Sequence, residues 1–258
     1  MKIVRTIAEL TRDRPLQGTG PRTGLVPTMG AFHAGHLALF GAAREENDDV
    51  VGSLFVNPAQ FGPAEDLGRY PRDEERDARL AEEAGVDVLF APSAEEMYPE
   101  GYATWVDVGD LGNRLEGEFR PDHFRGVATV CLKLFNIVRP TRAYFGQKDA
   151  QQAAVVKQLV RDLNLELEIR VVQTVRDDDG LALSSRNAYL SPQEREAALA
   201  LPRALATKDV DHARELLDSL DVDYVEEANF NGQRVLAAAV RIGKTRLIDN
   251  VVLEGERT

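Results

Sequence analysis

The amino-acid sequence predicts an α/β protein: a doubly wound parallel sheet followed by a smaller C-terminal α+β domain. The first observation is an alternation, from Val26 to Val172, of short β-branched apolar runs with amphipathic stretches, which is typical of parallel βαβ units. The second is a change after Thr174, where helical patterns come first and strand-like runs follow. We therefore expect a Rossmann-like domain over residues 1–174 and a small α+β domain over residues 175–258.

Length and charge limit the functions to consider. The chain has 258 residues, 43% of them hydrophobic, which is enough for one large and one small core. The formal net charge of −12 argues against a nucleic-acid or acidic-membrane partner, although local positive groups can still hold an anionic substrate. The single cysteine, Cys131, excludes an internal disulfide, and the start lacks a long apolar core, so we expect a cytoplasmic protein. No apolar run approaches the ~18 residues of a membrane helix.

The first elements of the large domain alternate between strands and helices. Residues 1–22 indicate a short strand and a helix before a polar loop. Gly85 is the expected C-terminal cap of a charged helix, because this position favours a left-handed backbone. The further expected elements are a strand around Val26, a helix from Gly35, a strand at 49–56, a Gly- and Pro-rich loop at 57–72, the charged helix at 73–84 and a strand at 86–90.

The second half of the large domain contains the longest helix. Apolar residues at helical spacing from 124 to 138 predict it, and they place Cys131 in the core. The elements expected here are an irregular stretch at 92–101, a short strand at 104–108, helices at 123–138 and 150–163, and strands at 143–145 and 167–172. The small domain should hold a polar turn at 177–180, two helices between Pro192 and Leu220, and strands at 222–225, 235–242 and 245–252.

A turn with two histidines is the strongest candidate site. It follows the Val26 strand directly and contains His33 and His36 with Gly30 and Gly35 around them, in a chain of four histidines. Ligands of open α/β sheets bind beyond the carboxyl ends of the strands, where a helix N-terminus favours anions. Imidazoles there can stabilise phosphate oxygens during group transfer. The alternatives are that the histidines only cap a helix or satisfy a core polar group, or that they bind zinc, for which no third ligand stands nearby.

Two further groups offer donors for a phosphate. In Gly146-Gln147-Lys148-Asp149, Lys148 would lie at the end of a strand, and Asp149 either caps the next helix or accepts from a ribose. In Ser184-Ser185-Arg186, two hydroxyls and a guanidinium could bind phosphate, although an ordinary polar turn explains them equally well. We interpret the acidic run 177–179 as a solvated turn rather than a metal site.

Other polar residues form weaker candidates. Arg120, His123 and Arg125 give local positive charge in an acidic chain, or belong to a loop that caps the following helix through Asp122. The loop at 57–72 carries neutral polar groups suited to a hydroxylated substrate, and solvation of the loop would explain them as well. These groups are Asn57, Gln60 and Tyr70.

The order of the motifs resembles one family over nearly the whole chain. The His-x-Gly-His turn resembles the signature of the nucleotidylyltransferase superfamily, and the longer strings resemble the pantothenate synthetase (pantoate–β-alanine ligase) family. These strings are Pro27–His36, Phe55–Gly62, Asp66–Arg72, His123–Val127, Tyr144–Gln152, Asp179–Asn187 and Thr245–Asn250.

The resemblance implies an ATP-dependent ligase. Pantoate would attack the α-phosphorus of ATP to give pantoyl adenylate and pyrophosphate, and β-alanine would then displace AMP to give pantothenate. Mg²⁺ would accompany ATP, the enzyme would be a homodimer, and the small domain would close over the site as a lid that excludes water.

The resemblance also implies residue roles. His33, His36, Lys148, Ser185 and Arg186 would be catalytic, with His36 in the place usually called a proton donor. ATP would be bound by Met29, Gly30, Ala31, Phe32, His33, Ala34, Gly35, His36, Gly146, Gln147, Lys148, Asp149, Val175, Leu183, Ser184, Ser185 and Arg186. Pantoate and β-alanine would be bound by Gln60, Gln152, Asn57, Tyr70, Arg120 and His123, and no protein metal ligand is assigned.

The chain departs from the family pattern in a few places. Phe32, Ala59 and Gln147 replace commoner residues, and the connection between Asp223 and Val235 is short. Two other functions remain alternatives: a nucleotidylyltransferase that stops after nucleotidyl transfer, and a nucleotide-binding protein without activity. The catalytic positions are all present, which disfavours the second alternative.

Overall fold

The computed structural model describes residues 1–12, 20–63, 65–230 and 232–253. The chain divides into two compact units: Met1–Phe145 with Val155–Val172, and Gly146–Ala154 with the chain from Gln173 onward. The short segment Gly146–Ala154 thus groups with the C-terminal unit, and the predicted domain boundary at residue 174 stays a prediction.

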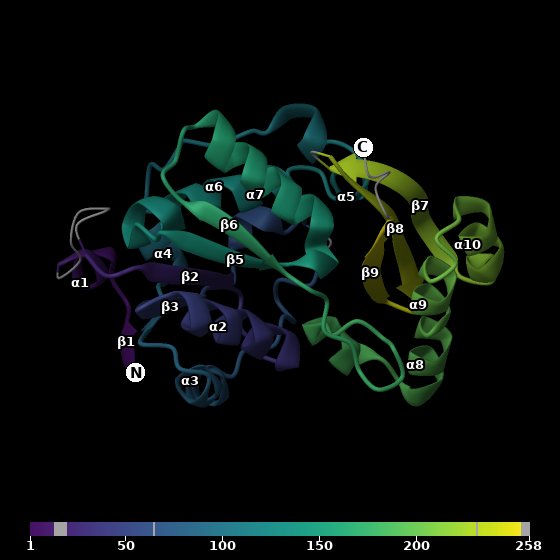
Figure 1. Ribbon diagram of the computed structural model, residues 1–258, viewed down its shortest axis with the longest axis horizontal. Helices are drawn as coiled ribbons and strands as arrows, with labels where there is room; N and C mark the ends of the chain where they lie inside the picture. The colour runs from purple at the N-terminus through teal and green to yellow at the C-terminus, as the bar shows by residue number, and fades with distance from the viewer. Residues whose placement is uncertain (13–19, 64, 231, 254–258) are drawn as a thin grey trace. The chain divides into compact units, whose positions relative to one another are not determined.

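A six-stranded sheet forms the centre of the first unit. Its strands lie in the order β1 (Lys2–Val4), β4 (Val88–Phe90), β3 (Asp49–Leu54), β2 (Thr23–Thr28), β5 (Arg142–Gly146) and β6 (Glu168–Val172) (Figure 1). β2 pairs in parallel with β3 on one side and with β5 on the other, since Leu25 lies opposite both Val51 and Ala143. The strand order reverses between β2 and β5, and this confirms the predicted doubly wound sheet.

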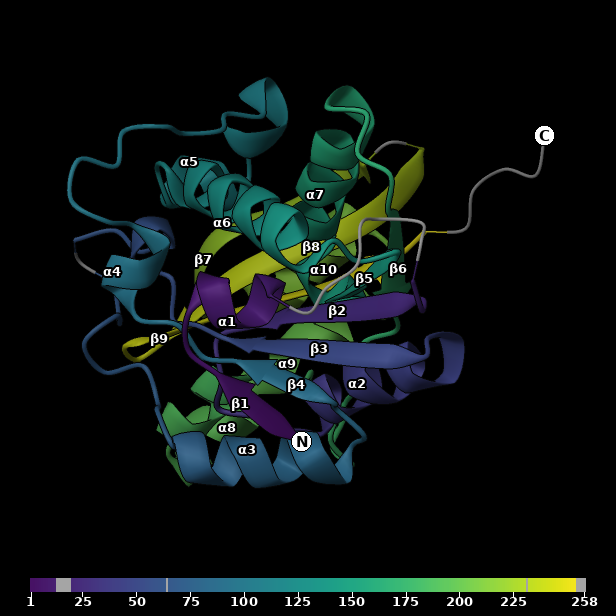
Figure 2. The ribbon, with the colours of Figure 1, turned by 90° about the vertical axis from the view of Figure 1, so that its left-hand side faces the viewer.

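Helices cover both faces of this sheet. α6 (His123–Val138) and α7 (Ala150–Asp162) lie on one face, and α2 (Ala34–Glu46) and α3 (Glu74–Glu83) on the other, as Figure 1 and Figure 2 show. The shorter elements are α1 (Ile7–Thr11), α4 (Ala94–Met97) and α5 (Glu116–Phe119), with 3-10 turns η1 (Pro58–Gln60), η2 (Gly109–Gly112) and η3 (Gln147–Asp149).

Local chemistry explains where the helices begin and end. The side chain of Asp73 accepts a hydrogen bond from the amide of Arg76 and so caps the N-terminus of α3. Gly85 follows the C-cap of this helix and has a left-handed backbone, with a φ of 82°. The predicted apolar stripe of α6 is buried, with Cys131 at 3% exposure, and burial raises the pKa of its thiol to about 12. Asp122 does occupy the N-cap position of α6, but its side chain makes no capping hydrogen bond.

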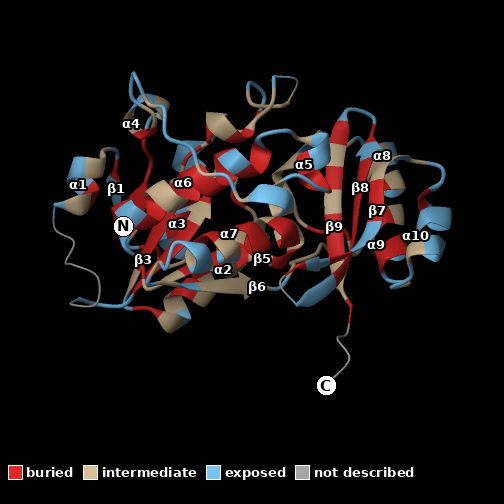
Figure 3. Ribbon diagram, turned by 90° about the horizontal axis from the view of Figure 1, so that it is seen from above, coloured by how far each residue is buried: buried red, intermediate tan, exposed pale blue. Residues whose placement is uncertain are grey.

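The second unit contains three strands and a layer of helices. β7 (Asp221–Phe230), β8 (Gln233–Ile242) and β9 (Thr245–Val252) form an antiparallel sheet with β8 in the middle. η4 (Ser185–Tyr189), α8 (Pro192–Ala198), α9 (Ala200–Leu205) and α10 (Val210–Leu217) precede them. Figure 3 shows β8 buried over most of its length, because it lies between two strands and packs its apolar residues into the core of this unit.

Several predicted elements were wrong in detail. The stretch 104–108 is not a strand: the amide of Val106 donates to Thr129 Oγ1 at 3.0 Å, so it bonds to a helix side chain instead of a neighbouring strand. The stretch 92–101 includes α4, capped by Ser93. Three helices, not two, lie between Pro192 and Leu220, and β7 continues to Phe230 because it forms a hairpin with β8. In the part of the chain that the structure describes, no helix has the length and apolar character needed to cross a membrane.

Candidate functional site

The turn with the two histidines joins β2 to α2. Gly30 and Ala31 both adopt positive φ angles, 86° and 53°, so the backbone reverses within two residues. His33 then takes the N-cap position, where its Nδ1 accepts from the amide of Gly35 at 3.2 Å. His36 completes a capping box, because its Nδ1 accepts from the amide of His33 at 3.3 Å.

This capping sets the chemistry of both imidazoles. A ring nitrogen that accepts a hydrogen bond carries no proton, so each neutral ring holds its proton on Nε2. The ring centroids of His33 and His36 lie 4.2 Å apart. The two histidines therefore cap the helix, as the first alternative predicted, and also present two N–H donors from adjacent rings. Capping and a role in phosphate chemistry are compatible.

Asp77 on α3 holds the backbone of this turn. Its carboxylate is 1% exposed and accepts hydrogen bonds from the amides of Ala31 at 2.7 Å and Phe32 at 2.8 Å. A side chain on Gly30 would collide with it, since a Cβ there would lie 2.9 Å from Asp77 Oδ2. Sequence reasoning missed Asp77. The available signal was its position four residues before Ala81, on the buried stripe of a charged helix.

A buried amide network follows β3. Gln60 donates from Nε2 to the Met29 sulfur at 3.3 Å and accepts at Oε1 from Asn57 Nδ2 at 3.0 Å. Asn57 Oδ1 in turn accepts from the hydroxyl of Tyr98 at 2.9 Å. Asn57 and Gln60 are 1% and 8% exposed, so these bonds define the orientation of both amides. Tyr98 is a second residue that sequence reasoning missed, and burial raises the pKa of its hydroxyl.

Gly126 lets α6 approach this network closely. A Cβ at Gly126 would lie 2.3 Å from the carbonyl oxygen of Ala59, so no larger residue fits without displacing the backbone. The carbonyl of Gly126 also accepts from Asn57 Nδ2 at 3.2 Å. The close approach explains why a glycine follows Arg125 in the first turn of the helix.

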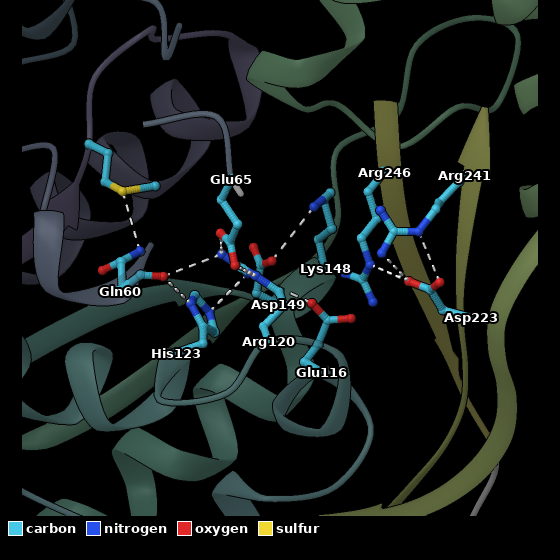
Figure 4. A network of polar contacts seen from close by, with 11 residues as sticks. Gln60, Glu65, Glu116, Arg120, His123, Lys148, Asp149, Asp223, Arg241 and Arg246 are labelled. Atoms are coloured by element: carbon cyan, nitrogen blue, oxygen red, sulfur yellow. Dashed lines mark hydrogen bonds and ion pairs between the residues drawn. The ribbon is translucent and has the colours of Figure 1, made fainter. Parts of the chain in front are cut away.

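Arg120 connects α5, α6 and the loop after β3 (Figure 4). Its guanidinium donates to both oxygens of Glu65, at 3.0 Å and 2.6 Å, and lies 3.8 Å from Glu116. Burial raises the pKa of Glu65, but the hydrogen bonds and charge of Arg120 outweigh this and hold that pKa below its usual value. The positive charge of Arg120 is thus matched within the protein by two carboxylates.

His123 is held as a neutral imidazole in the same network. The carbonyl oxygen of Gln60 lies 2.9 Å from Nδ1 and can only accept, so Nδ1 carries the proton. Arg120 lies 3.1 Å from Nε2 and can only donate, so Nε2 is the acceptor. Burial and the charge of Arg120 lower the pKa of His123 to about 4. Tyr70, the remaining candidate of this region, is buried against Phe61 with ring centroids 6.0 Å apart.

The candidate phosphate residues other than the two histidines lie in the second unit. Gly146 ends β5, and Lys148 follows in η3, where its ammonium lies 3.6 Å from Asp149 Oδ1. Gln152 lies in the first turn of α7 and is partly exposed. Within the parallel sheet β5 is the neighbour of β2, and the strand order reverses between these two strands.

A short hairpin brings Val175 to the Ser-Ser-Arg segment. The carbonyl of Val175 accepts from the amide of Leu183 at 3.0 Å, next to a bridge between Arg176 and Ala182. Ser184 then caps η4, since its Oγ accepts from the amide of Arg186 at 3.2 Å. The predicted contacts with adenine and with phosphate therefore come from opposite arms of one hairpin.

The acidic run in this hairpin is neutralised by an arginine. Arg195 donates to Asp177 at 2.6 Å and to Asp179 at 2.7 Å. Among the described residues no group of three His, Cys, Asp or Glu side chains is arranged to hold a metal ion. These contacts give Asp177 and Asp179 a structural partner.

The structure thus joins some predicted residues and leaves others in separate segments. In the first unit one network links Met29, Asn57, Gln60, Arg120 and His123. In the second unit the hairpin joins Val175 to Leu183, while Gly146–Asp149 forms its own segment after β5. The roles assigned to all these residues remain predictions.

Comparison with known proteins was made by sequence and by structure. The family model for pantoate-beta-alanine ligase matches residues 2–252. A pantothenate synthetase of Acetivibrio thermocellus is 50% identical over 280 residues, covering 98% of this chain and 100% of the relative. One from Heliobacterium modesticaldum is 53% identical over 280 residues, with 98% and 100% covered. Both alignments are longer than the 258 residues of this chain, so the relatives contain residues that it lacks, consistent with the short connection before Val235.

Two solved structures extend the comparison to the fold. The pantothenate synthetase of Thermus thermophilus superposes with a TM-score of 0.92 at 48% identity, covering 97% of this chain and 99% of that one. The pantoate-beta-alanine ligase of Francisella tularensis, complexed with β-γ ATP and β-alanine, superposes with a TM-score of 0.89 at 37% identity, with 98% and 97% covered. With the family model matching almost every described residue, this chain belongs to the pantoate–β-alanine ligase family.

Proposed function

We propose that this chain condenses pantoate with β-alanine, using ATP, through a pantoyl-adenylate intermediate. A carboxylate oxygen of pantoate attacks the α-phosphorus of ATP, and the bond from that phosphorus to the bridging oxygen of pyrophosphate breaks. The amine of β-alanine then attacks the acyl carbon, loses a proton and displaces AMP. The single observation that carries the proposal is the full-length family match at about half identity, over a chain that retains both signature histidines.

His33 and His36 stabilise the phosphates of ATP during the first step. Their capping bonds place a proton on Nε2 of each neutral ring, so each ring can donate to an oxygen whose charge grows as pyrophosphate leaves. Lys148, Ser185 and Arg186 supply further donors and positive charge to the phosphates. Adenylyl transfer needs positioning and charge stabilisation more than covalent help from the protein.

The amide network of the first unit binds pantoate. Gln60 and Asn57 are held in one orientation by their mutual hydrogen bond, and neutral amides suit the hydroxyl and carboxylate groups of this substrate. Gln152 contributes another amide, and Met29 supplies an apolar wall beside Gln60. A site whose polar groups are already oriented loses less entropy when the substrate binds.

Arg120, His123 and Tyr70 serve the β-alanine step by organising its site. Arg120 is already paired with Glu65, so we assign it the positioning of the loop after β3 rather than a single contact with the substrate. The neutral His123 fixes the backbone of Gln60 through its Nδ1–H. Tyr70 packs on Phe61 in the same loop, and this contact helps to hold the loop in place.

The remaining assignments follow the family. Mg²⁺ enters with ATP, held mainly by phosphate oxygens and water, which is the usual mode for this ion with nucleotides. The enzyme is a homodimer in the cytoplasm. Size-exclusion chromatography with light scattering measures the dimer, and chelation of Mg²⁺ followed by its return measures the metal requirement.

The test of the ligase function is the dependence of AMP and pantothenate formation on both substrates. With ATP, pantoate and β-alanine together, AMP and pantothenate should form in equal amounts. Omission of β-alanine should stop turnover after the adenylate forms. Sustained pyrophosphate release without β-alanine, with no amide product, would instead support the alternative of a nucleotidylyltransferase.

A further inference from the structure

The motif Thr245–Asn250 has no role in the function described so far. In the structure it forms most of β9, at the edge of the small antiparallel sheet. Its last two residues are polar yet buried, with Asp249 2% and Asn250 5% exposed. A polar side chain is costly to bury unless it makes hydrogen bonds. The hydrogen-bond partners of Asp249 and Asn250 therefore show which segments the motif holds in place.

Asn250 binds the two backbone carbonyls that flank the Cα of Lys148. Its Nδ2 donates to the carbonyl of Gln147 at 2.9 Å and to the carbonyl of Lys148 at 2.8 Å. Its Oδ1 accepts from Nε2 of Gln147 at 3.1 Å. Both hydrogens of the amide are therefore used. These bonds connect β9 to η3 at Lys148, the residue whose side chain carries the ammonium.

Asp249 binds a different segment. Its carboxylate accepts from both terminal nitrogens of Arg176, at 2.6 Å and 3.1 Å. Arg176 also donates to the carbonyl of Gly180 at 3.1 Å, inside the hairpin between Val175 and Leu183. Neighbouring residues of one strand thus hold two segments to which ATP contacts are assigned.

We propose that Asn250 is a positioning residue for Lys148, and that it acts by fixing the backbone carbonyls of Gln147 and Lys148. This inference rests on the proposed function, in which Lys148 binds the phosphates of ATP. Lysine is a point charge on a flexible stem, so the place of its ammonium depends on where its backbone is held. A displacement of about 1 Å at a catalytic group can lower the rate about 10²-fold.

The variant Asn250→Asp tests this role with no change in side-chain volume. It removes both N–H donors and places a carboxylate oxygen against two carbonyl oxygens. We expect kcat for pantothenate formation to fall about 10²-fold, the scale of a displaced catalytic group, while the KM for pantoate changes less than about 3-fold. Asn250→Ala, which removes the donors without adding repulsion, should give a smaller loss of kcat in the same direction.

A matched control separates positioning from general loss of stability. Val240 on β8 is fully buried in the core of the same unit, and its partners across the sheet are Val222 and Leu247. Val240→Ala should lower the urea midpoint of unfolding and leave kcat unchanged at temperatures where it is folded. If Val240→Ala and Asn250→Ala lower kcat equally at equal loss of stability, Asn250 is only a structural residue.

A double-mutant cycle with Lys148→Ala decides whether Asn250 acts through Lys148. Single-turnover pyrophosphate release is the readout, since slow variants can be followed in it. We expect Asn250→Asp to cost about 10²-fold in the parent and less than about 3-fold in the Lys148→Ala background. Equal losses in both backgrounds would overturn the inference. A parent enzyme that makes no pantothenate would overturn the proposed function instead, so the two failures are distinguishable.

Discussion

Replacement of Asp77 by asparagine removes the charge that holds the histidine turn. The carboxylate accepts from the amides of Ala31 and Phe32 at 2.7 Å and 2.8 Å in a fully buried position. In Asp77→Asn the side-chain oxygen can still accept from one of these two backbone amides. The other backbone amide then faces the side-chain NH₂ group, so two buried donors oppose each other. Hydrogen bonds to charged groups contribute about 1.5–3 kcal/mol each, and a buried unsatisfied group costs about 1–3 kcal/mol. We expect the free energy of unfolding to fall by about 2–4 kcal/mol.

The same change should reach the active site. Ala31 has a φ of 53°, a conformation that costs a residue with a Cβ about 1–2 kcal/mol and that Asp77 stabilises. Without the carboxylate the turn can relax and move His33 and His36 with it. We expect kcat/KM for ATP to fall by about 10- to 100-fold, the scale of a small misplacement of catalytic groups.

The assays are urea unfolding and steady-state kinetics, with Glu75→Gln as the matched control. Glu75 lies in the first turn of the same helix but is exposed, so its loss reports only the interaction of a carboxylate with the helix dipole, about 0.3–1 kcal/mol. If Asp77→Asn unfolds at the same urea concentration as Glu75→Gln and keeps the ATP kinetics of the parent, the reasoning about the turn is refuted.

Three further predictions concern charge and protonation. The pKa of His123, about 4 in the folded protein, lies below its value near 6.5 in the unfolded chain. As the pH falls through 6.5, only the unfolded state gains this proton, so His123 should lower the free energy of unfolding by roughly 3 kcal/mol between pH 6.5 and 4. The measurement is urea unfolding against pH for the parent and His123→Asn, and parallel profiles would contradict the prediction. Glu65→Gln leaves the guanidinium of Arg120 with Glu116 as its carboxylate partner, so unfolding should cost about 1–3 kcal/mol less and the KM for β-alanine should rise; an unchanged KM would remove Arg120 from the β-alanine step. His36→Ala should lower kcat about 10²-fold or more, the scale of losing one transition-state donor, and an unchanged kcat would exclude the role given to that ring.

The large domain could be predicted because its signals are local. The parallel strands are short β-branched runs, and the helix ends at Asp73 and Gly85 follow from cap chemistry that involves neighbouring residues. The stretch 104–108 shows the limit of such signals. Trp105, Val106 and Val108 have strand propensity, but a strand also needs a partner, and the amide of Val106 finds a threonine hydroxyl on α6 instead.

The sequence indicates which residues are candidates for the site, but it does not indicate the contacts that hold them. The histidine turn is visible as a motif, whereas Asp77 lies 46 residues from Ala31 and is surrounded by other charges in the sequence. The same holds for Asn250, which lies 102 residues from Lys148 and meets it only through the fold. The neutral state of His123 likewise depends on a carbonyl 63 residues away. Tertiary contacts of this kind leave no local pattern.

Transfer of an oxygen label from pantoate to AMP tests the adenylate mechanism most directly. Pantoate labelled with ¹⁸O in its carboxylate is incubated with ATP, β-alanine and the enzyme, and the nucleotide product is analysed by mass spectrometry. Because the attacking carboxylate oxygen stays on phosphorus when the amine displaces AMP, each AMP formed should carry one labelled oxygen. Unlabelled AMP, or label in inorganic phosphate with ADP as the nucleotide product, would contradict the pantoyl-adenylate intermediate.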